Sequence, residues 1–590
     1  MRSNGYFING VLRKYLFPTI LAILGTTVVS FINGMLVGKM LGRDALTAVN
    51  IVSSFTFLFS MLGCLINIGA SSEASVAIGR EDYKRVGACT TYALIASIVT
   101  PVLAAIPCVV FFEEFMELMG ADEAMYLISL DYARIMLIFG FLTTLMYFPF
   151  NFLRLDGRAS HAVALFGSMA AMDVAFVLLF LRMGLGLPGV GLAIVLSTAV
   201  VDIIGIFCLL SRKGSVIRLG VIRFGDIAEL SRNVWARGSA AGLNNLCNML
   251  RTMILNAWIL RYLGADGAGE FAVACSIMNL TAASVSGSGQ TIAPLAGIFY
   301  GEKDTESLRM VVKNAVRYAL WIHMALCVIA IPAARHIAGA FGMVTEPVAS
   351  ETALAIIAVF ISLIPAAALN VYIYYYMTLK KVVLSCALML SRSFVFMVLF
   401  AGVLLVSGHG EFFYVAFPMA ELTTILIMLL LGFVDRIHNP KRIGMLLYIN
   451  EMPEGSYISF SVESNTAGAV EASAKMAEFC DEHKLEQKIK MFLPMALEEL
   501  LITVNEYCLK NRFDEYIDVR IYLDAEGLLL RIRCNGLKFD PVAWYRKKSE
   551  EMSVEEMLMD DALGMKMIVE QAKSVTYQNT FGMNNLVVIL

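Results

Sequence analysis

Four charged side chains stand inside long apolar stretches of the sequence, and their chemistry is the first guide to a site. Asp173 and Asp202 lie in the first half of the chain, and Arg392 and Glu421 lie in the second. A charge at the centre of a membrane costs roughly 2.5–3.5 kcal/mol or more, so such residues are rare and mark ion or substrate pathways. Carboxylates in these surroundings can bind a proton or a sodium ion, or attract an organic cation. All four residues are therefore candidates for a binding site.

The first half of the chain adds an amide to its two acids. Asn33 stands in the first apolar stretch and could face both Asp173 and Asp202. An amide can ligate sodium or hold a substrate, but it cannot carry a proton. If this half couples to an ion, Asp173 or Asp202 must supply the charge. The alternative is a structural acid that forms hydrogen bonds between helices.

The second half holds a basic and an acidic residue that could neutralise one another. Arg392 and Glu421 would then be a structural pair; alternatively, Glu421 attracts a cationic substrate or exchanges a proton when the pair opens. Asn244, Asn248 and Arg251 recur at i, i+4 and i+7 and so share one face of a helix. In a membrane, that face should turn toward a cavity or a neighbouring helix and away from lipid.

The elements that must position these residues are membrane helices. Of the 590 residues, 58% are hydrophobic and 16% are charged, whereas soluble domains are about 45–50% apolar and about 25% charged. A span needs about 20 apolar residues. Twelve stretches meet this requirement: 15–38, 46–70, 87–112, 131–153, 160–182, 189–211, 236–262, 270–295, 314–334, 351–379, 383–406 and 412–433.

A sequence pattern returns after 222 residues and divides these spans into two sets of six. Leu41-Gly42-Arg43-Asp44 and Gly79-Arg80-Glu81-Asp82 recur as Leu263-Gly264-Ala265-Asp266 and Gly301-Glu302-Lys303-Asp304. A repeat of this length within an apolar chain is typical of a transporter built from two halves.

Basic residues gather in one set of loops, which indicates the orientation in the membrane. This set includes Arg80, Lys84, Arg154, Arg158, the 212–237 segment, Lys380 and Lys381. Loops rich in Lys and Arg face the cytoplasm. We therefore expect a multi-pass protein of the bacterial inner membrane with both chain ends inside. Tyrosines 372, 374, 375 and 376 crowd the cytoplasmic end of the tenth span, where we predict an aromatic belt.

Several of these stretches resemble the multidrug and toxic compound extrusion (MATE) transporters. Phe31–Gly42 looks like the first helix of that family, and the stretch around Asn256 and Leu263-Gly264 looks like its seventh. Phe152–Gly157 is similar to its turn after span four, and Pro188–Ala193 to its entry into span six. The resemblance covers about residues 10–435. It implies two six-helix bundles around a central cavity, with efflux driven by a proton or sodium gradient.

One position departs from the MATE pattern. The resemblance implies a cation site in the first half, built on an acid in span one with partners in span five. Asn33 occupies the position of that acid. Coupling through the first half is then in doubt unless Asp173 or Asp202 replaces the missing charge.

Residues 455–590 read as a separate α/β domain. Residues 451–590 hold 24 acidic and 15 basic residues, against 25 and 31 in the preceding 450. Strands are predicted at 457–462, 517–523, 527–533, 574–577 and 585–590, and helices at 467–483, 491–509 and 563–572. Residues 517–533 should form a hairpin, because two strand-like runs flank a short turn.

This tail resembles the ATP-binding domain of the anti-sigma-factor serine kinases, within the histidine-kinase-like ATPases. The stretches that carry the resemblance are Ala496–Leu501, Asn535–Pro541 and Leu563–Ile568. It implies that Glu499, Asn535, Gly536 and Gly564 are nucleotide-site positions. Thr503 stands where the family has its magnesium-binding Asn, Cys534 replaces its adenine-reading Asp, and Gly564 alone is left of its glycine-rich lid. A thiol cannot replace the carboxylate in that hydrogen bond, and phosphoryl transfer without a magnesium ligand loses its main charge neutralisation. We therefore predict a non-catalytic, regulatory module without an ATP cofactor; weak nucleotide binding stays open as an alternative, because Glu499 is retained.

These observations predict an α-helical polytopic membrane protein of twelve spans in two six-helix repeats, followed by a cytoplasmic α/β two-layer sandwich. The domains are expected at 1–211, 212–235 (linker), 236–435, 436–454 (linker) and 455–590. We predict an antiporter for organic cations or related small molecules, coupled to protons or sodium. Its partners are the lipid bilayer and a cytoplasmic protein bound by the tail, with no nucleic acid.

The sequence also leaves three other functions open. They are a membrane sensor that signals through the tail, a lipid-linked sugar flippase, and an active membrane kinase. A flippase should line its cavity with several basic residues, and only Arg251 and Arg392 are found; Cys534 and Thr503 argue against the kinase. The eleven cysteines form no Cys-x-x-Cys pair or Cys/His cluster, so we predict neither a metal site nor a disulfide framework.

Overall fold

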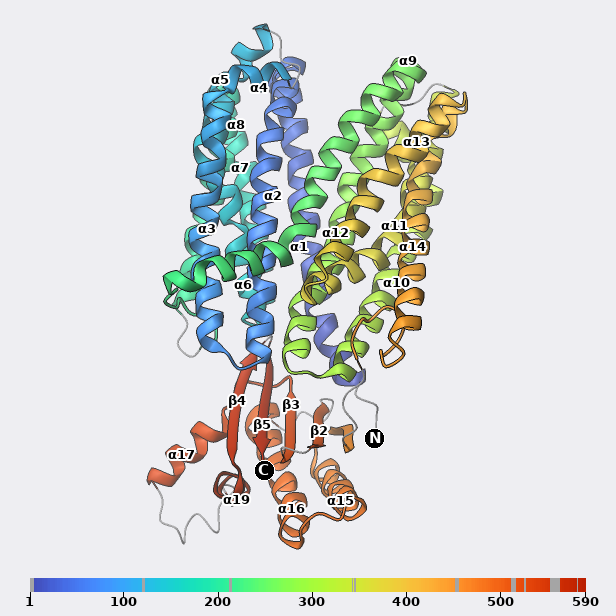
Figure 1. The fold of residues 1–590 in the computed structure, drawn as a ribbon. Helices are drawn as coiled ribbons and strands as arrows, with labels where there is room; N and C mark the ends of the chain where they lie inside the picture. The colour runs from blue at the N-terminus through green and yellow to red at the C-terminus, as the bar shows by residue number, and fades with distance from the viewer. Residues whose placement is uncertain are drawn as a thin grey trace.

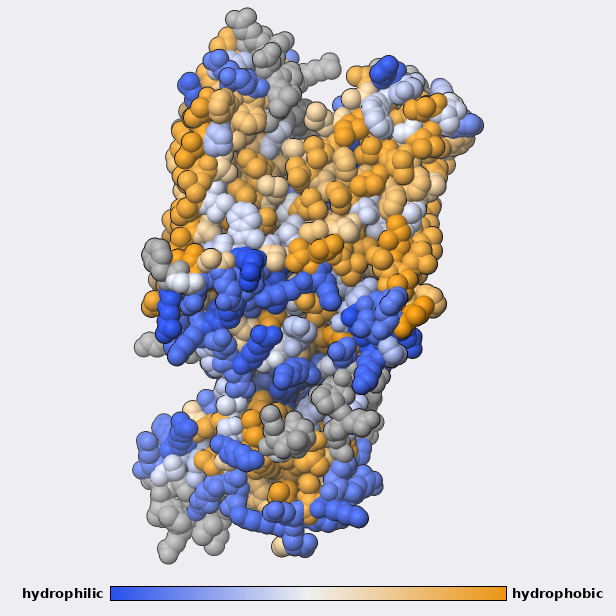
Figure 2. Space-filling model, viewed as in Figure 1, coloured by the Kyte–Doolittle hydropathy of each residue, from blue (hydrophilic) through white to orange (hydrophobic). Residues whose placement is uncertain are grey.

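The computed structural model describes residues 5–118, 123–211, 215–341, 343, 346–450, 456–510, 516–524, 527–551, 563–580 and 582–590. A tall bundle of helices stands on a smaller α/β domain, which we call the tail (Figure 1). The end of the bundle next to the tail is named the tail side, and the opposite end the far side. On the face seen in Figure 2, an apolar belt crosses the bundle and a polar band lies where the bundle meets the tail.

The bundle consists of two lobes that follow one another along the chain. The first lobe comprises α1 (Gly5–Leu41), α2 (Arg43–Gly79), α3 (Tyr83–Val110), α4 (Phe112–Leu118), α5 (Glu123–Leu145), α6 (Tyr147–Leu155), α7 (Ala159–Arg182) and α8 (Gly186–Leu210). After the short η1 (Phe224–Asp226), the second comprises α9 (Ile227–Gly301), α10 (Thr305–Ala340), α11 (Val348–Thr378), α12 (Val382–Leu390), the π-helical η2 (Ser391–Val395), α13 (Phe396–Val406), η3 (Gly410–Val415) and α14 (Ala416–His438). The last nine residues of the predicted 212–235 linker are therefore helical.

Eleven helices in the described part of the chain are long and apolar enough to cross a membrane. The predicted span that is not among them is the seventh, 236–262. It is helical, as the first part of α9, but it carries Arg237, Asn244, Asn248 and Arg251. The prediction of twelve spans and the eleven apolar helices thus differ at one helix, whose polar face makes it less apolar than its neighbours.

The structure gives a physical reason for the sequence repeat. Gly42 and Gly264 have φ angles of 92° and 72°, which glycine adopts without a steric penalty. Each glycine turns the chain between two long helices. Two aspartates of the repeat are N-caps: Asp82 accepts a hydrogen bond from the Arg85 amide and Asp304 accepts one from the Ser307 amide, both at 3.0 Å. The two halves therefore share the chemistry of their turns.

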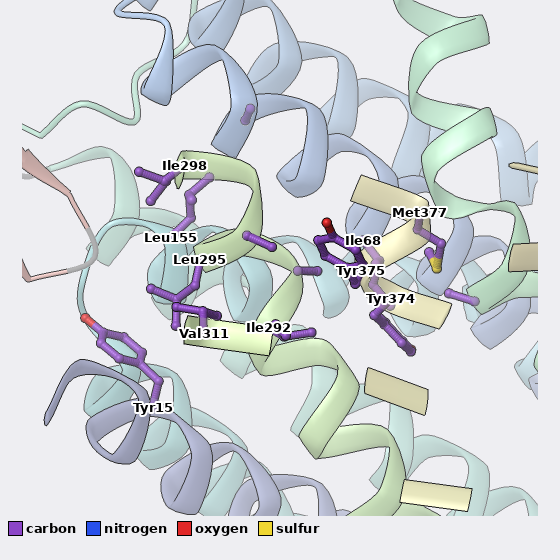
Figure 3. Packing of buried hydrophobic residues seen from close by; sticks show 14 of the residues in the cluster. Tyr15, Ile68, Leu155, Ile292, Leu295, Ile298, Val311, Tyr374, Tyr375 and Met377 are labelled. Atoms are coloured by element: carbon purple, nitrogen blue, oxygen red, sulfur yellow. The ribbon is translucent and has the colours of Figure 1, made fainter. Parts of the chain in front are cut away.

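The two lobes pack together on the tail side and separate on the far side (Figures 1 and 2). One buried apolar cluster on the tail side contains residues of both lobes, including Tyr15, Leu155, Ile292, Val311 and Tyr375 (Figure 3). The remaining halves have separate cores. That of the first lobe includes Val37, Phe55, Phe59, Tyr132 and Val190, and that of the second includes Leu255, Phe271, Val359, Phe413 and Phe417.

Glycines bring the lobes into backbone contact on the tail side. A Cβ placed on Gly238 of α9 would lie only 1.8 Å from the Leu65 carbonyl oxygen of α2, so no larger residue fits there. A Cβ on Gly79 would likewise meet the Ile298 carbonyl oxygen at 2.2 Å. The backbones of α2 and α9 are therefore in direct contact at these positions.

The predicted aromatic belt in span ten is wrong for three of its four tyrosines. Tyr374, Tyr375 and Tyr376 are at most 5% exposed and belong to the shared cluster. The Tyr375 and Tyr376 hydroxyls donate to the carbonyls of Leu447 and Leu446, at 2.7 and 2.9 Å. Each tyrosine packs its ring in the core and uses its hydroxyl to hold the segment after α14.

The tail is a five-stranded antiparallel sheet with helices packed on one face. The strands are β1 (Ser456–Glu463), β2 (Tyr516–Asp524), β3 (Gly527–Cys534), β4 (Ser574–Thr580) and β5 (Met583–Ile589), in the order β1-β2-β3-β5-β4. The helices are α15 (Thr466–Glu482), α16 (Gln487–Thr503), the π-helical η4 (Val504–Leu509), α17 (Pro541–Glu551) and α19 (Leu563–Gln571). The predicted 517–533 hairpin is confirmed, with Val519 opposite Ile532.

The two faces of this sheet differ in chemistry, because successive side chains of a strand point to opposite sides. Phe460, Val519, Ile532 and Leu586 are aligned across neighbouring strands and form the core with the helices. The opposite face is polar. It carries Asp518, Arg520, Arg531, Arg533, Thr576, Gln578 and Asn585.

Candidate functional site

The first lobe brings an amide and an acid together across two helices. Asn33 of α1 donates from Nδ2 to Oδ2 of Asp173 in α7, at 2.7 Å. Asn33 is buried and Asp173 is half-buried. The Oδ1 atom of each is a buried acceptor without a hydrogen-bond partner among the described residues. Oxygen ligands of this kind suit hard cations. The pair can therefore hold a cation or a proton on Asp173.

Asp202 of α8 is the more deeply buried of the two acids in this lobe, with 1% of its surface exposed. Neither of its carboxylate oxygens has a hydrogen-bond partner in the part of the chain that the structure describes. Asn33 faces Asp173 and forms no hydrogen bond with Asp202, so the expectation that Asn33 could face both acids holds for one of them. A buried carboxyl without a partner needs a proton or a cation.

In the second lobe, the basic and acidic candidates form an ion pair. Arg392 donates from Nε and Nη2 to the Glu421 carboxylate of α14, at 2.8–3.1 Å, and both side chains are about 10% exposed. Arg392 lies in η2, and π-helical segments are frequent at functional sites. Ser393 of the same segment donates to Asn244 Oδ1 of α9 at 3.2 Å. Arg392 and Glu421 therefore neutralise one another, as expected for a structural pair.

The other two predicted site residues of α9, Asn248 and Arg251, differ in their surroundings. Asn248 is half-buried. Arg251 is 8% exposed, and among the described residues its Nε has no hydrogen-bond partner. Together with Arg392 and Glu421, Arg251 gives the second lobe a net positive cluster, whereas the candidates of the first lobe are acidic.

A further acid, Glu73 of α2, lies at the centre of a charge cluster on the tail side. It is 4% exposed. Arg85 of α3 donates to its Oε1 at 2.7 and 3.0 Å, and Arg237 of α9 donates to its Oε2 at 2.6 Å. Lys380, after α11, lies 3.8 Å from Oε2. These contacts connect the first lobe to the second.

Glu73 lies outside the predicted second span, 46–70, and was therefore not among the predicted site residues. The helix runs on to Gly79, and the apolar stretch from Ile51 to Gly79 includes this acid. A longer window would have shown a carboxylate near the end of an apolar helix, with basic residues in the adjacent loop.

Around Cys534 and Gly536 of the predicted nucleotide site, the described side chains of the tail pack closely. Cys534 Sγ lies 2.9 Å from Cys508 Sγ, and Asn584 Nδ2 donates to Cys508 Sγ and to the Leu537 carbonyl, both at 2.9 Å. The cavity between these side chains measures about 10 Å³, which is barely the space of one water molecule. Gly536 backs against Cys508, where an added Cβ would lie 2.4 Å from the carbonyl oxygen.

The remaining positions of this set are separate from that cavity. Asn535 follows β3 and is half-buried, and Glu499 lies half-buried in α16. Gly564 is the second residue of α19. Residues 552–562, where the lid of such a domain would precede Gly564, lie outside the described residues.

Two lobes of membrane helices, related by a repeat and each holding buried polar residues, define a transporter of the two-lobe class. The MatE family model matches residues 18–179 and 240–403, and the two matched stretches begin 222 residues apart. This match covers more than half of the chain, which therefore belongs to the MATE family of membrane transporters.

Known proteins share this architecture. The chain is 24% identical over 323 residues to "Probable multidrug resistance protein YoeA" of Bacillus subtilis, covering 52% of this chain and 67% of that protein. A solved outward-facing conformation of a multidrug resistance MATE family transporter of the MOP superfamily superposes with a TM-score of 0.69 at 18% identity, covering 74% and 97% of the two chains. A MOP superfamily transporter from Pyrococcus furiosus, described as having a binding pocket of reverse polarity, gives 0.67 at 19%, covering 74% and 97%.

Proposed function

We propose that this protein is a secondary active antiporter that exports small organic molecules, with the tail side facing the cytoplasm. The observation that carries this proposal is the arrangement of the apolar cores. The lobes share one core on the tail side and have separate cores in the other half. This is the arrangement of a transporter that is closed on one side and open on the other, as alternating access requires. The multidrug resistance names of the relatives support the substrate class.

The orientation rests on charge. The loops predicted to be cytoplasmic from their basic residues are those that meet the tail: Glu81, Gly157 and Asp304 all lie against it. A soluble domain with a charged surface belongs in water, so these loops and the tail share one aqueous side. The excess of Lys and Arg makes that side the cytoplasm.

Coupling is assigned to the first lobe. Asp173 and Asp202 are acids without a basic partner among the described residues, and Asp173 has the Asn33 amide as its partner. A proton or sodium ion that enters from the far side neutralises them, and its release into the cytoplasm drives the cycle. The excess negative charge of this lobe also favours a cationic substrate. The amide at Asn33 can ligate sodium but cannot carry a proton, so a coupling proton at that pair would have to be bound by Asp173.

The tail is proposed to be regulatory and non-catalytic. Its cavity of about 10 Å³ next to Cys534 is far too small for a base, and a thiol there cannot accept from an adenine amino group as a carboxylate would. Titration of the full-length protein with magnesium and ATP tests this assignment. Saturable binding at micromolar concentration would contradict it.

The proposed function is tested by the uptake of a fluorescent organic cation into inverted membrane vesicles under an imposed proton or sodium gradient. We expect uptake that depends on one of the two gradients and stops when an ionophore dissipates it. Uptake that continues without a gradient would overturn the antiporter assignment. Absence of uptake with either ion, in folded protein, would favour the sensor, and movement of a lipid-linked sugar would favour the flippase.

A further inference from the structure

The polar face of the tail sheet is buried against the membrane domain. Arg520 and Arg533 are at most 1% exposed and Arg531 is 6% exposed, although they lie on the sheet face opposite the core of the tail. Charged side chains are almost never buried without partners. Their partners are Asp518 of the tail and the acidic residues of the turn between α9 and α10.

Ion pairs join this sheet face to that turn. Arg533 Nη2 donates to Asp304 Oδ2 at 2.7 Å and to Glu302 Oε2 at 2.9 Å. Arg531 donates to Glu302 at 3.2 Å, and Arg520 donates to Asp304 Oδ1. Burial opposes ionisation of Asp304, but the three arginine charges outweigh it and hold the pKa of this carboxyl well below its usual range. The tail is therefore anchored to the second lobe by charged hydrogen bonds, which are the strong kind.

The contacts of the tail with the first lobe are weaker. Thr576 Oγ1 donates to Glu81 Oε1 at 3.2 Å. The turn before β5 lies against α1, since a Cβ on Gly582 would lie 3.0 Å from the Tyr15 hydroxyl and 3.8 Å from the Gly157 carbonyl. Met583 is 3% exposed and belongs to the cluster shared by the lobes, not to the core of the tail.

The two contacted turns are the repeated ones. Glu81 belongs to Gly79–Asp82 of the first lobe, and Glu302 and Asp304 belong to Gly301–Asp304 of the second. Gly79 and Gly301 touch one another, as an added Cβ on either would lie 2.9 Å from the Cα of the other. The tail thus spans the seam where the tail-side ends of the lobes meet.

We propose that the tail is a lock on the tail-side closed state, anchored to the second lobe and released from the first lobe when the transporter opens to the cytoplasm. This inference rests on the proposed alternating access. One rigid domain cannot follow two turns that move apart, so it must leave one of them. The charged contacts favour remaining on the second lobe, and the contact of Thr576 and Gly582 with the first lobe is the one that breaks. A ligand or protein that pulls the tail away would therefore activate transport.

The experiment uses the full chain and weakens the first-lobe contact without touching the anchor. Met583→Asp puts a charge into the apolar cluster that the lobes share, next to the Gly582 contact, and Thr576→Ala removes the hydrogen bond to Glu81. Met491→Ala is the control, because this methionine is 69% exposed on α16. Opening is read from maleimide labelling of Ser75→Cys, a fully buried position of α2 at the seam, in a background whose other reactive cysteines are replaced. Transport is measured in parallel.

We expect Met583→Asp to raise the labelling rate of the Ser75→Cys thiol by roughly fivefold or more, Thr576→Ala to raise it less, and Met491→Ala to leave it unchanged. Labelling and transport should rise together. If both release variants are folded and label at the parental rate, the tail is not a lock. If labelling rises while no variant transports any tested cation, the lock stands and the proposed transport function fails.

Discussion

The two lobes place charge in the membrane in opposite ways. In the first lobe, Asp173 has only an amide partner and Asp202 has none among the described residues. In the second lobe, Glu421 is held by two nitrogens of Arg392. An acid without a countercharge can gain and lose a cation, whereas a paired acid is already neutralised. In the proposed mechanism, lobes related by a repeat therefore differ in role: the first would exchange an ion and the second would maintain the structure.

The largest expected effect on stability comes from breaking the ion pair between Arg392 and Glu421. Glu421→Gln leaves Arg392 uncompensated beside Arg251, and we expect the free energy of unfolding to fall by about 3–5 kcal/mol, as for other buried pairs that lose one partner. Thermal unfolding in lipid nanodiscs measures it. The double variant Arg392→Met with Glu421→Leu should regain most of the loss. A single variant as stable as the parent would show that the pair is not structural.

The acid beside Asn33 should behave in the opposite manner. Asp173→Asn leaves no buried charge behind, so we expect a folded protein of nearly parental stability whose gradient-driven uptake falls at least tenfold, a change of about 1.4 kcal/mol in the barrier. Asp131→Asn, an exposed acid on α5 with its side chain 71% accessible, is the matched control. Unchanged gradient-driven uptake by Asp173→Asn would remove this residue from coupling.

Asp202 offers a change of the opposite sign. Because its carboxylate is buried without a partner, Asp202→Leu should raise the free energy of unfolding by about 1 kcal/mol, while Glu421→Gln lowers it. If Asp202 also carries the coupling ion, the same variant loses uptake. Equal destabilisation by the two substitutions would erase the contrast between the lobes. Parallel unfolding and uptake measurements on one preparation decide this.

The smallest effect concerns the charged anchor of the tail. A carboxyl whose pKa is lowered by folding contributes stability above its unfolded pKa of about 3.9, and this contribution is lost only as the pH falls below that value. The lowered pKa of Asp304 therefore predicts that the contribution of this carboxyl to docking of the tail is independent of pH between about 5 and 8. Hydrogen exchange in β2 and β3 should show constant protection over this range. Loss of protection near pH 6 would indicate a different titrating group.

Local sequence was sufficient for the elements and for some of their contacts. The apolar stretches gave the helices, the alternation of residues gave the strands of the tail, and the offset of 222 residues marked two turns whose glycines have positive φ. The pairing of Arg392 with Glu421 could also be anticipated, because two opposite charges in neighbouring spans have little choice of partner. These features depend on residue type and spacing, which a sequence displays directly.

Only the tertiary structure decided which distant groups meet. Asn33 pairs with Asp173 and not with Asp202, although both acids lie in apolar helices, because the rotation of each helix about its axis selects the contact. Glu73 unites two lobes through arginines 12 and 164 residues away. The alternation of residues along the strands gives the tail sheet a polar face, but only the packing of the domains shows that this face is buried on the turns of the repeat. The spacing of residues along the chain determines which side chains share a face of a helix or strand. The packing of whole helices and sheets determines which side chains from distant parts of the chain come into contact.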